Sequence, residues 1–307
     1  PIAAIMHDGR AARAAGRCGL GAVMGSKSLK AITVLGREKT PIYDKKGLLK
    51  CLSGITKEIN KNLAGMSLLG TGGALASLEE VGALPLKNWK GTERWKEGAA
   101  KITGAAMKER MGNGKYGCER WVVKCGREIH IKGGVYDGLK GAGPEYETLA
   151  SLGSLCLVSD VEAIAYANDL CNRYGIDTIS IGGIIAFAME AFEKGIITKG
   201  DTGGIDLSWG NSDAMVETVR MICENKGIGS ILSRGVLKAA KAIGKGAEEF
   251  AIHSNGLEFP MHDPRAYMTL AVEYATSARG ACHLSGLSHG FERSITLPEI
   301  GLKETPN

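Results

Sequence analysis

The chain has 307 residues, of which 44% are hydrophobic and 23% are charged, and its formal net charge is +5. These values are typical of a folded globular protein and exclude a disordered chain. Lysines and arginines are scattered, with no basic run interleaved with aromatics, so nucleic-acid binding is not indicated. No apolar stretch approaches the roughly 18–20 residues of a membrane helix.

Glycine and cysteine usage adds two constraints. The 44 glycines are about twice the average usage and follow no Gly-X-Y period, which excludes collagen and predicts many tight turns and close backbone approaches. Several of the eight cysteines fall within apolar helical patterns. This usage suits a reducing cytosol better than a disulfide framework, so the sequence predicts a cytoplasmic protein.

The first predicted elements are two short strands, at residues 1–9 and 30–36, with a glycine-rich segment between them. From about Tyr43, apolar residues recur along one face of a predicted helix. A shorter helix is predicted at residues 73–81. Residues 84–101 are predicted to be irregular, and residues 103–117 to be short, polar and interrupted by glycines.

Helix caps are the clearest signals in the second half of the chain. Asp160 is a predicted N-cap, and Gly175 is a predicted C-cap of the same helix. Asp177 or Thr178 begins the next helix, which ends near Gly195. Further helices are predicted from Asn211 or Ser212, at residues 228–242 and at residues 265–278. About eight helices and very few strands after residue 42 predict a mainly α fold.

The glycine loop at residues 16–27 is the first motif with chemical potential. Its glycine spacing is one residue too long for a dinucleotide fingerprint, and the Walker pattern is absent. Its backbone N–H groups, with Arg17 and Lys27, suit an anionic ligand. A purely structural turn is the alternative.

Other candidate groups follow in chain order. Cys118 and Cys125 favour a metal or an iron–sulfur cluster, although two thiols cannot complete such a site and two unrelated buried cysteines are the alternative. Glu145 and Glu147 flank a tyrosine after a Gly-Pro turn, and either carboxylate could act as an acid or base if desolvated, or simply begin a helix. His283 is a candidate proton donor or ligand, or a structural histidine.

Taken together, these segments resemble the tungsten-containing aldehyde:ferredoxin oxidoreductases. The match is carried, in order and at fitting separations, by residues 16–32, 143–148, 175–190 and 274–283. The resemblance covers essentially the whole chain. It implies a tungsten bis-molybdopterin cofactor beside a [4Fe–4S] cluster.

The resemblance also implies a domain organisation. Residues 1–45 would be the C-terminal tail of the pterin-binding, β-rich first domain, residues 46–252 the helical second domain, and residues 253–307 the start of the helical third domain. Because full-length members of the family are longer, we expect the chain to be part of a larger protein.

Site roles are carried over residue by residue. Glu147 and His283 match the acid/base pair near the metal. Asn172 stands where the family has a carboxylate, so that contact with the pterin is altered. The resemblance places the pterin contacts at Arg17, Cys18, Leu20, Asn172, Ile176, Asp177, Arg279 and Gly280.

The cluster motif is the main departure from the family. Cys118 and Cys125 match its first and third cysteines, Trp121 stands at the second position, and the fourth cysteine would lie beyond Asn307. A tryptophan cannot ligate iron. The cluster is therefore incomplete, different or absent, unless the second position was misassigned.

The resemblance implies that an aldehyde is oxidised to a carboxylic acid, with electrons passed through the cluster to ferredoxin or a ferredoxin-like subunit. A homodimer is compatible with the resemblance. The segment around Cys125 is also similar to the tungsten subunit of class II benzoyl-CoA reductases, which would make an aromatic ring the substrate. The alternative outside the enzymes is an inactive helical fragment or scaffold without cofactors.

Overall fold

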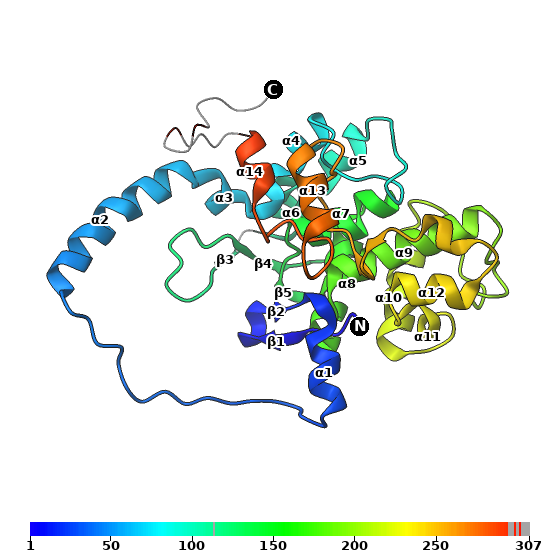
Figure 1. Cartoon of the computed structure of the whole chain (residues 1–307), viewed down its shortest axis with the longest axis horizontal. Coiled ribbons are helices and arrows are strands. Elements are labelled where there is room, and N and C mark those ends of the chain that lie inside the picture. Colours follow the sequence, from blue (N-terminus) through cyan, green and yellow to red (C-terminus); the bar gives the residue numbers. More distant parts are fainter. Residues whose placement is uncertain (113, 294–297, 299–300, 302–307) are drawn as a thin grey trace.

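The computed structural model describes residues 1–112, 114–293, 298 and 301 (Figure 1). Within these residues the protein is mainly helical, with labelled helices α1 to α14, and the predicted fold class is confirmed. Several helices are shorter than eight residues, which is why their number exceeds the eight expected. No helix in this part of the chain is long and apolar enough to cross a membrane.

The N-terminal segment forms a small antiparallel hairpin. Strand β1 (Ile5–His7) pairs with β2 (Arg13–Ala15), and helix α1 (Leu20–Ser26) follows. The predicted strand at residues 30–36 is wrong, because these residues form no strand. Val34 and Leu35 are 85% and 78% exposed, so the segment has neither a strand edge to pair with nor an apolar surface to cover it.

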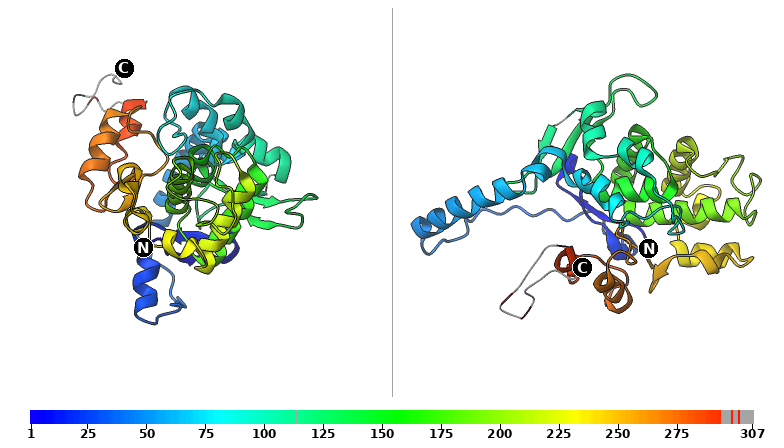
Figure 2. Two further views of the ribbon diagram at one scale, coloured as in Figure 1. Left: turned by 90° about the vertical axis from the view of Figure 1, so that its right-hand side faces the viewer. Right: turned by 90° about the horizontal axis from the view of Figure 1, so that it is seen from above.

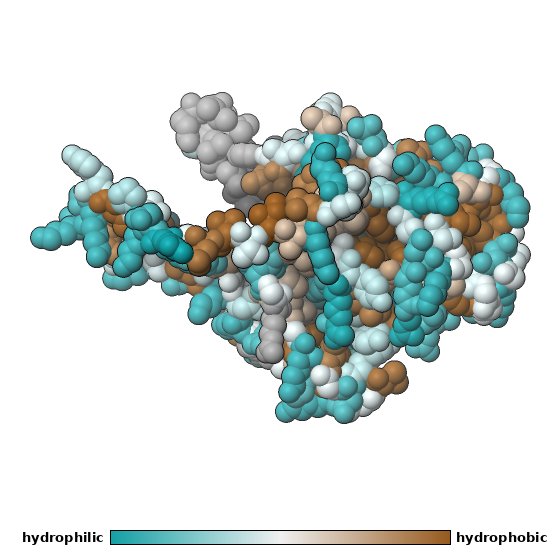
Figure 3. Space-filling view, turned by 90° about the horizontal axis from the view of Figure 1, so that it is seen from below, coloured by the Kyte–Doolittle hydropathy of each residue, from teal (hydrophilic) through white to brown (hydrophobic). Residues whose placement is uncertain are grey.

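The predicted helix after Tyr43 is confirmed as α2 (Lys45–Asn62), which Asp44 caps by accepting a hydrogen bond from the backbone of Gly47. No residue of α2 is buried. The helix projects away from the body of the molecule (Figure 2). Hydrophobic side chains therefore lie open on its surface, as the projecting arm in Figure 3 illustrates.

The next part of the chain contains more structure than predicted. Helix α3 (Ala64–Leu69) precedes α4 (Leu75–Glu80), which corresponds to the helix predicted at residues 73–81. The prediction that residues 84–101 are irregular is wrong at their end, where α5 (Lys96–Lys101) forms, and α6 (Gly104–Met111) was not predicted. Both are short, and packing rather than periodicity explains them, since Ala99 and Met107 lie in the core.

A three-stranded antiparallel sheet follows, in the order β3 (Gly114–Tyr116), β4 (Gly126–His130) and β5 (Lys140–Ala142). Strands β3 and β4 enclose the loop that carries Cys118 and Trp121.

Three helices form the centre of the core: α7 (Tyr146–Leu152), α8 (Val161–Tyr174) and α9 (Thr178–Glu193). The predicted caps are confirmed. Asp160 accepts hydrogen bonds at the start of α8, Gly175 ends α8 in the left-handed conformation (φ 68°), and Asp177 caps α9. Helix α9 is buried on almost every side, because it is apolar around most of its circumference.

The remaining helices flank this core. Asn211 caps α10 (Ser212–Glu224). The single helix predicted at residues 228–242 is two helices, because Gly235 (φ 85°) interrupts it. The remaining elements are α11 (Gly229–Leu232), α12 (Val236–Ile243), β6 (His253–Ser254), β7 (Leu257–Glu258), α13 (Met268–Thr276) and α14 (Ser288–Arg293). The predicted helix at 265–278 is thus shorter, and the end of the predicted third domain lies outside the described residues.

Helices α7 and α9 approach so closely that only glycine fits at residue 182. A Cβ there would lie 2.6 Å from the carbonyl oxygen of Ser151. We expect Gly182→Ala to lower the free energy of unfolding by about 1–3 kcal/mol through overpacking, measured by urea denaturation. Gly54→Ala in α2 is the matched control, since its Cβ would meet no atom within 4 Å. Equal stability of G182A and the wild type would contradict this packing.

Candidate functional site

The site forms where the N-terminal segment meets the junction between α8 and α9. Ala3 and Ile176 form an antiparallel bridge, flanked by hydrogen bonds from Ala4 N to Gly175 O (2.7 Å) and from Asp177 N to Ile2 O (3.0 Å). The helical core therefore fixes the start of the chain through backbone contacts.

The glycine loop packs against the same N-terminal segment. The backbone N–H of Gly21 donates to Ala3 O at 3.0 Å, and a Cβ at Gly21 would collide with the carbonyl of Ala4. Gly19 (φ 67°) approaches Pro1 in the same way. Close approach of the chain to itself is thus sufficient to require glycine at both positions.

Arg17 joins this loop to the C-terminal part of the chain. Its guanidinium donates to the carbonyl oxygens of Ala281 (2.7 Å) and Glu258, and its Nε lies 3.8 Å from Oδ2 of Asp177. The side chains of Arg17 and Asp177 are only 8% and 6% exposed. Asp177 also accepts from the N–H groups of Ile179 and Ser180, so one carboxylate both caps α9 and faces the arginine.

A cavity of about 650 Å³ opens beside this arginine. It brings together most of the predicted site residues from five segments of the chain. Those that line it are Arg17, Leu20, Cys118, Glu147, Asn172, Ile176, Asp177, Arg279 and His283.

Three predicted site residues do not line this cavity: Cys18, Cys125 and Gly280. Gly280 (φ 95°) packs against the backbone of Ser254, which explains the glycine without a ligand. Cys18 lies close enough to Arg279 to interact with its guanidinium.

Arg279 also donates to the thiol of Cys282. Burial raises the pKa of Cys282, but hydrogen bonds from Ser285, Leu284 and Arg279 outweigh burial and leave the pKa below its ordinary value.

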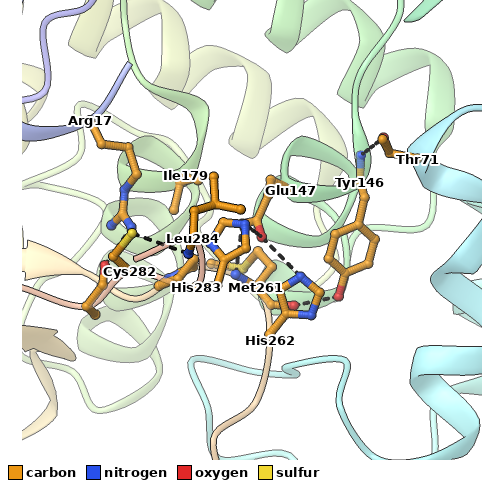
Figure 4. A network of polar contacts seen from close by, with 12 residues as sticks. Arg17, Thr71, Tyr146, Glu147, Ile179, Met261, His262, Cys282, His283 and Leu284 are labelled. Carbon is orange, nitrogen blue, oxygen red and sulfur yellow. Dashed lines mark hydrogen bonds and ion pairs between the residues drawn. The ribbon is translucent and has the colours of Figure 1, made fainter. Parts of the chain in front are cut away.

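Glu147 lies beside the cavity between two imidazoles (Figure 4). Its Oε1 is 3.4 Å from Nε2 of His283 and 3.5 Å from Nε2 of His262, while Oε2 accepts a hydrogen bond from the backbone N–H of Met261 at 2.8 Å. Burial raises the pKa of Glu147, and the nearby imidazole, backbone N–H and guanidinium offset only part of this effect.

His283 has the opposite shift. Burial and the nearby positive charge of Arg17 lower its pKa to about 4, so this imidazole is neutral at physiological pH. A carboxyl that is easier to protonate than usual thus faces an imidazole that is harder to protonate. Such opposed shifts are typical of groups that exchange protons.

His262 is the residue that the sequence analysis missed. It lies in the loop before α13, packs against Tyr146 with the rings tilted by 34° and their centroids 5.0 Å apart, and is 8% exposed. The only signal was the position of His262 between Pro260 and Pro264, which predicts a rigid loop but no chemistry.

Glu145, the second candidate carboxylate, has a different environment. It pairs with Arg13 at 3.0 Å and accepts a hydrogen bond from Thr71 at 2.6 Å. The same guanidinium donates to the hydroxyl of Tyr116 at 2.5 Å. Glu145 is therefore held as a structural ion pair, and Glu147 is the carboxylate that faces groups able to exchange protons.

Comparison with known proteins identifies the family. The profile described as "Aldehyde ferredoxin oxidoreductase, domains 2 & 3" matches residues 50–306, and the profile of the N-terminal domain matches residues 1–36. The chain belongs to the aldehyde ferredoxin oxidoreductase family. The predicted domain limits near residues 45 and 252 stay predictions.

Relatives in this family include the tungsten-containing aldehyde ferredoxin oxidoreductase of Thermococcus kodakarensis, 38% identical over 92% of the chain and 46% of the relative. The protein of the same name from Pyrococcus furiosus is 36% identical over the same shares. The aliphatic sulfonate oxidoreductase WOR-like subunit of Pyrococcus furiosus is 33% identical, over 89% of the chain and 44% of the relative. The chain thus spans just under half the length of these relatives.

Among solved structures, the active site complex BamBC of benzoyl-coenzyme A reductase, in complex with 1,5-dienoyl-CoA, superimposes with a TM-score of 0.72. The sequences are 23% identical, and the match covers 91% of the chain and 43% of that structure. This likeness establishes a shared fold.

The cavity offers groups that fit the pterin expected from the sequence resemblance. Arg17 and Arg279 supply positive charge for a phosphate, while Asn172 and Asp177 supply groups that hydrogen-bond a heterocycle. Nε of Arg17 is buried and has no hydrogen-bond partner among the described residues. A hydrogen-bond acceptor on a bound ligand would satisfy this buried donor.

The residues present do not fit a complete [4Fe–4S] cluster. Cys118 is exposed and lines the cavity, Cys125 is half-buried, and Trp121 lies between them in sequence. Within the described residues, the only group of three or more side chains placed to hold a metal contains no cysteine. Two thiolates are fewer than the four that such a cluster needs.

The low pKa of His283 generates a prediction about stability. In the unfolded chain this imidazole takes a proton near pH 6.5, whereas in the folded protein it does so only near pH 4. Stability is therefore lost as the pH falls from about 6.5 to about 4. We expect His283→Gln to remove about 2–3 kcal/mol of that loss, measured by urea unfolding in a chelating buffer.

His7→Gln changes the same residue type at an exposed position and provides the control. An H283Q variant as acid-sensitive as the wild type would show that His283 is not buried in its neutral form.

Proposed function

We propose that the protein carrying this chain oxidises an aldehyde to a carboxylic acid at a tungsten bis-pterin centre and delivers the electrons to ferredoxin. The observation that carries the proposal is Glu147, a buried carboxyl that faces His283 beside a cavity lined by arginines. Family membership and the names of four relatives, all tungsten-containing aldehyde ferredoxin oxidoreductases, support the substrate class.

The cavity residues divide into binding and proton-transfer groups. Arg17 and Arg279 would hold the pterin phosphate, and Asn172 and Asp177 would hydrogen-bond its ring. When bound, the tungsten centre supplies the two-electron redox chemistry of the reaction.

Oxidation of an aldehyde consumes one water and releases two protons and two electrons. Glu147 accepts a proton at Oε1, because its raised pKa brings its basicity closer to the working pH. His283 stays neutral and orients the substrate oxygen by donating a hydrogen bond. The low exposure of both side chains, 18% and 12%, limits the access of bulk water.

The described residues provide two cysteines, Cys118 and Cys125, near the expected place of the iron–sulfur cluster. Family membership supports ferredoxin as the electron acceptor. The same proposal includes residues 1–45 as the tail of the first domain, residues 46–252 as the second domain and residues 253–307 as the start of the third.

The proposal is tested on the purified protein by metal analysis, pterin analysis and substrate assays. We expect tungsten and pterin to copurify, and reduction of ferredoxin to depend on added aldehyde. Absence of tungsten, molybdenum and pterin would favour an inactive scaffold. Activity with benzoyl-CoA and none with aldehydes would favour an aromatic ring reductase.

The roles of the two carboxylates can be separated by matched variants. We expect Glu147→Gln to lower kcat by about 100- to 10,000-fold, because it removes the proton acceptor, while the tungsten and pterin content stays unchanged. Glu145→Gln changes the same residue type two positions away, where the charge is neutralised by Arg13, and we expect less than a tenfold loss. Steady-state kinetics measures both, and the reverse order of effects would assign the proton transfer to Glu145.

A further inference from the structure

Glu147, His262 and His283 form a compact set of donor atoms. One atom from each lies within 4.8 Å of the other two, and the two carboxylate–imidazole separations are 3.4 and 3.5 Å. In a tetrahedral zinc site with bonds of about 2.1 Å, neighbouring ligand atoms lie about 3.4 Å apart. Two edges of the set therefore match such a site, and the third, between the two imidazoles, is no longer than 4.8 Å.

The carboxylate is already oriented for this role. Oε2 of Glu147 is fixed by the backbone N–H of Met261, while Oε1 is buried and accepts no hydrogen bond from any described residue. A buried carboxylate oxygen without a donor is costly, and a cation between it and two imidazoles would remove that cost.

The backbone beside His262 is held by two tyrosines. The hydroxyl of Tyr146 donates to the carbonyl of Met261 at 2.5 Å, and the hydroxyl of Tyr274 donates to the carbonyl of His262 at 3.0 Å. These contacts fix the backbone that carries the imidazole of His262, and with it the direction from which this ligand approaches Glu147.

From this geometry we propose that Glu147, His262 and His283 form a binding site for a divalent cation of the zinc class. Two imidazoles and one carboxylate are the donor set that such ions prefer, and three protein ligands leave a fourth position free for water or another small ligand. Glu147 and His283 also line the cavity, so the bound cation would lie at its wall.

Cation binding and proton transfer use the same atoms and exclude one another. A cation bound to Oε1 of Glu147 prevents that oxygen from accepting a proton. If the proposed aldehyde oxidation is correct, micromolar Zn²⁺ should inhibit it by competing with the proton acceptor. The cation site itself does not depend on that activity.

Binding is measured on the purified protein, after chelator treatment, by titrating Co²⁺ and following its visible d–d absorption, and by calorimetry with Zn²⁺. We expect one tight site per chain with the intense absorption of tetrahedral cobalt. His262→Gln should weaken binding at least about 100-fold, since loss of an outer-shell partner alone costs 10- to 100-fold.

His7 lines the same cavity but lies outside the proposed ligand set, so His7→Gln is the matched control. It should leave the affinity and the spectrum unchanged. Circular dichroism confirms that each variant is folded, and Glu147→Gln, which preserves side-chain volume, provides a second test of the ligand set.

Wild-type affinity in folded H262Q and E147Q, or loss of the site in H7Q, would overturn the cation site. Tight binding without inhibition of aldehyde oxidation would retain the site and overturn the proposed proton role of Glu147. Failure of the site and failure of the proposed function are thereby distinguished.

Discussion

The arrangement of the site depends on the buried guanidinium of Arg17. It contacts Asp177 at the start of α9 and the carbonyls of Glu258 and Ala281, which come from two later segments. Removing one partner of a buried ion pair costs about 3–5 kcal/mol, because the other charge is left uncompensated. The loop that carries His283 therefore has a fixed position relative to the N-terminal segment, although more than 260 residues separate them in sequence.

Two carboxylates on the same short segment show how this scaffold assigns chemistry. Glu145 lies against Arg13 and accepts from Thr71, so its negative charge is compensated. Glu147 lines the same cavity, but there burial raises its pKa and two imidazoles approach it. Both residues are glutamates, and they lie only two positions apart after the same Gly-Pro turn. The difference arises from neighbours that are distant in sequence.

The dependence of each site residue on neighbours distant in sequence sets the limit of prediction from the sequence. Caps act locally, so Asp160, Gly175 and Asp177 could be predicted as helix boundaries. The prediction of a strand at residues 30–36 was wrong because a strand requires a partner strand. Helices α5 and α6 were missed because packing against the core, rather than a periodic pattern of apolar residues, stabilises them. Most of the predicted site residues share one cavity, yet the family resemblance rather than the spacing of residues selected them. His262 lay outside every motif, and only the fold brings it to Glu147.

Part of the glycine excess has its explanation in close crossings of the backbone. Gly19 and Gly21 cross the N-terminal segment, Gly182 crosses α7, and Gly280 crosses the strand at Ser254, each so closely that a Cβ would collide with backbone. Backbone atoms have few alternative positions, so a crossing of this kind fixes two segments more rigidly than side-chain packing does. Gly280 lies three residues before His283, and Gly19 lies two residues after Arg17. The glycines thus hold in register the segments that carry the guanidinium and the imidazole of the site.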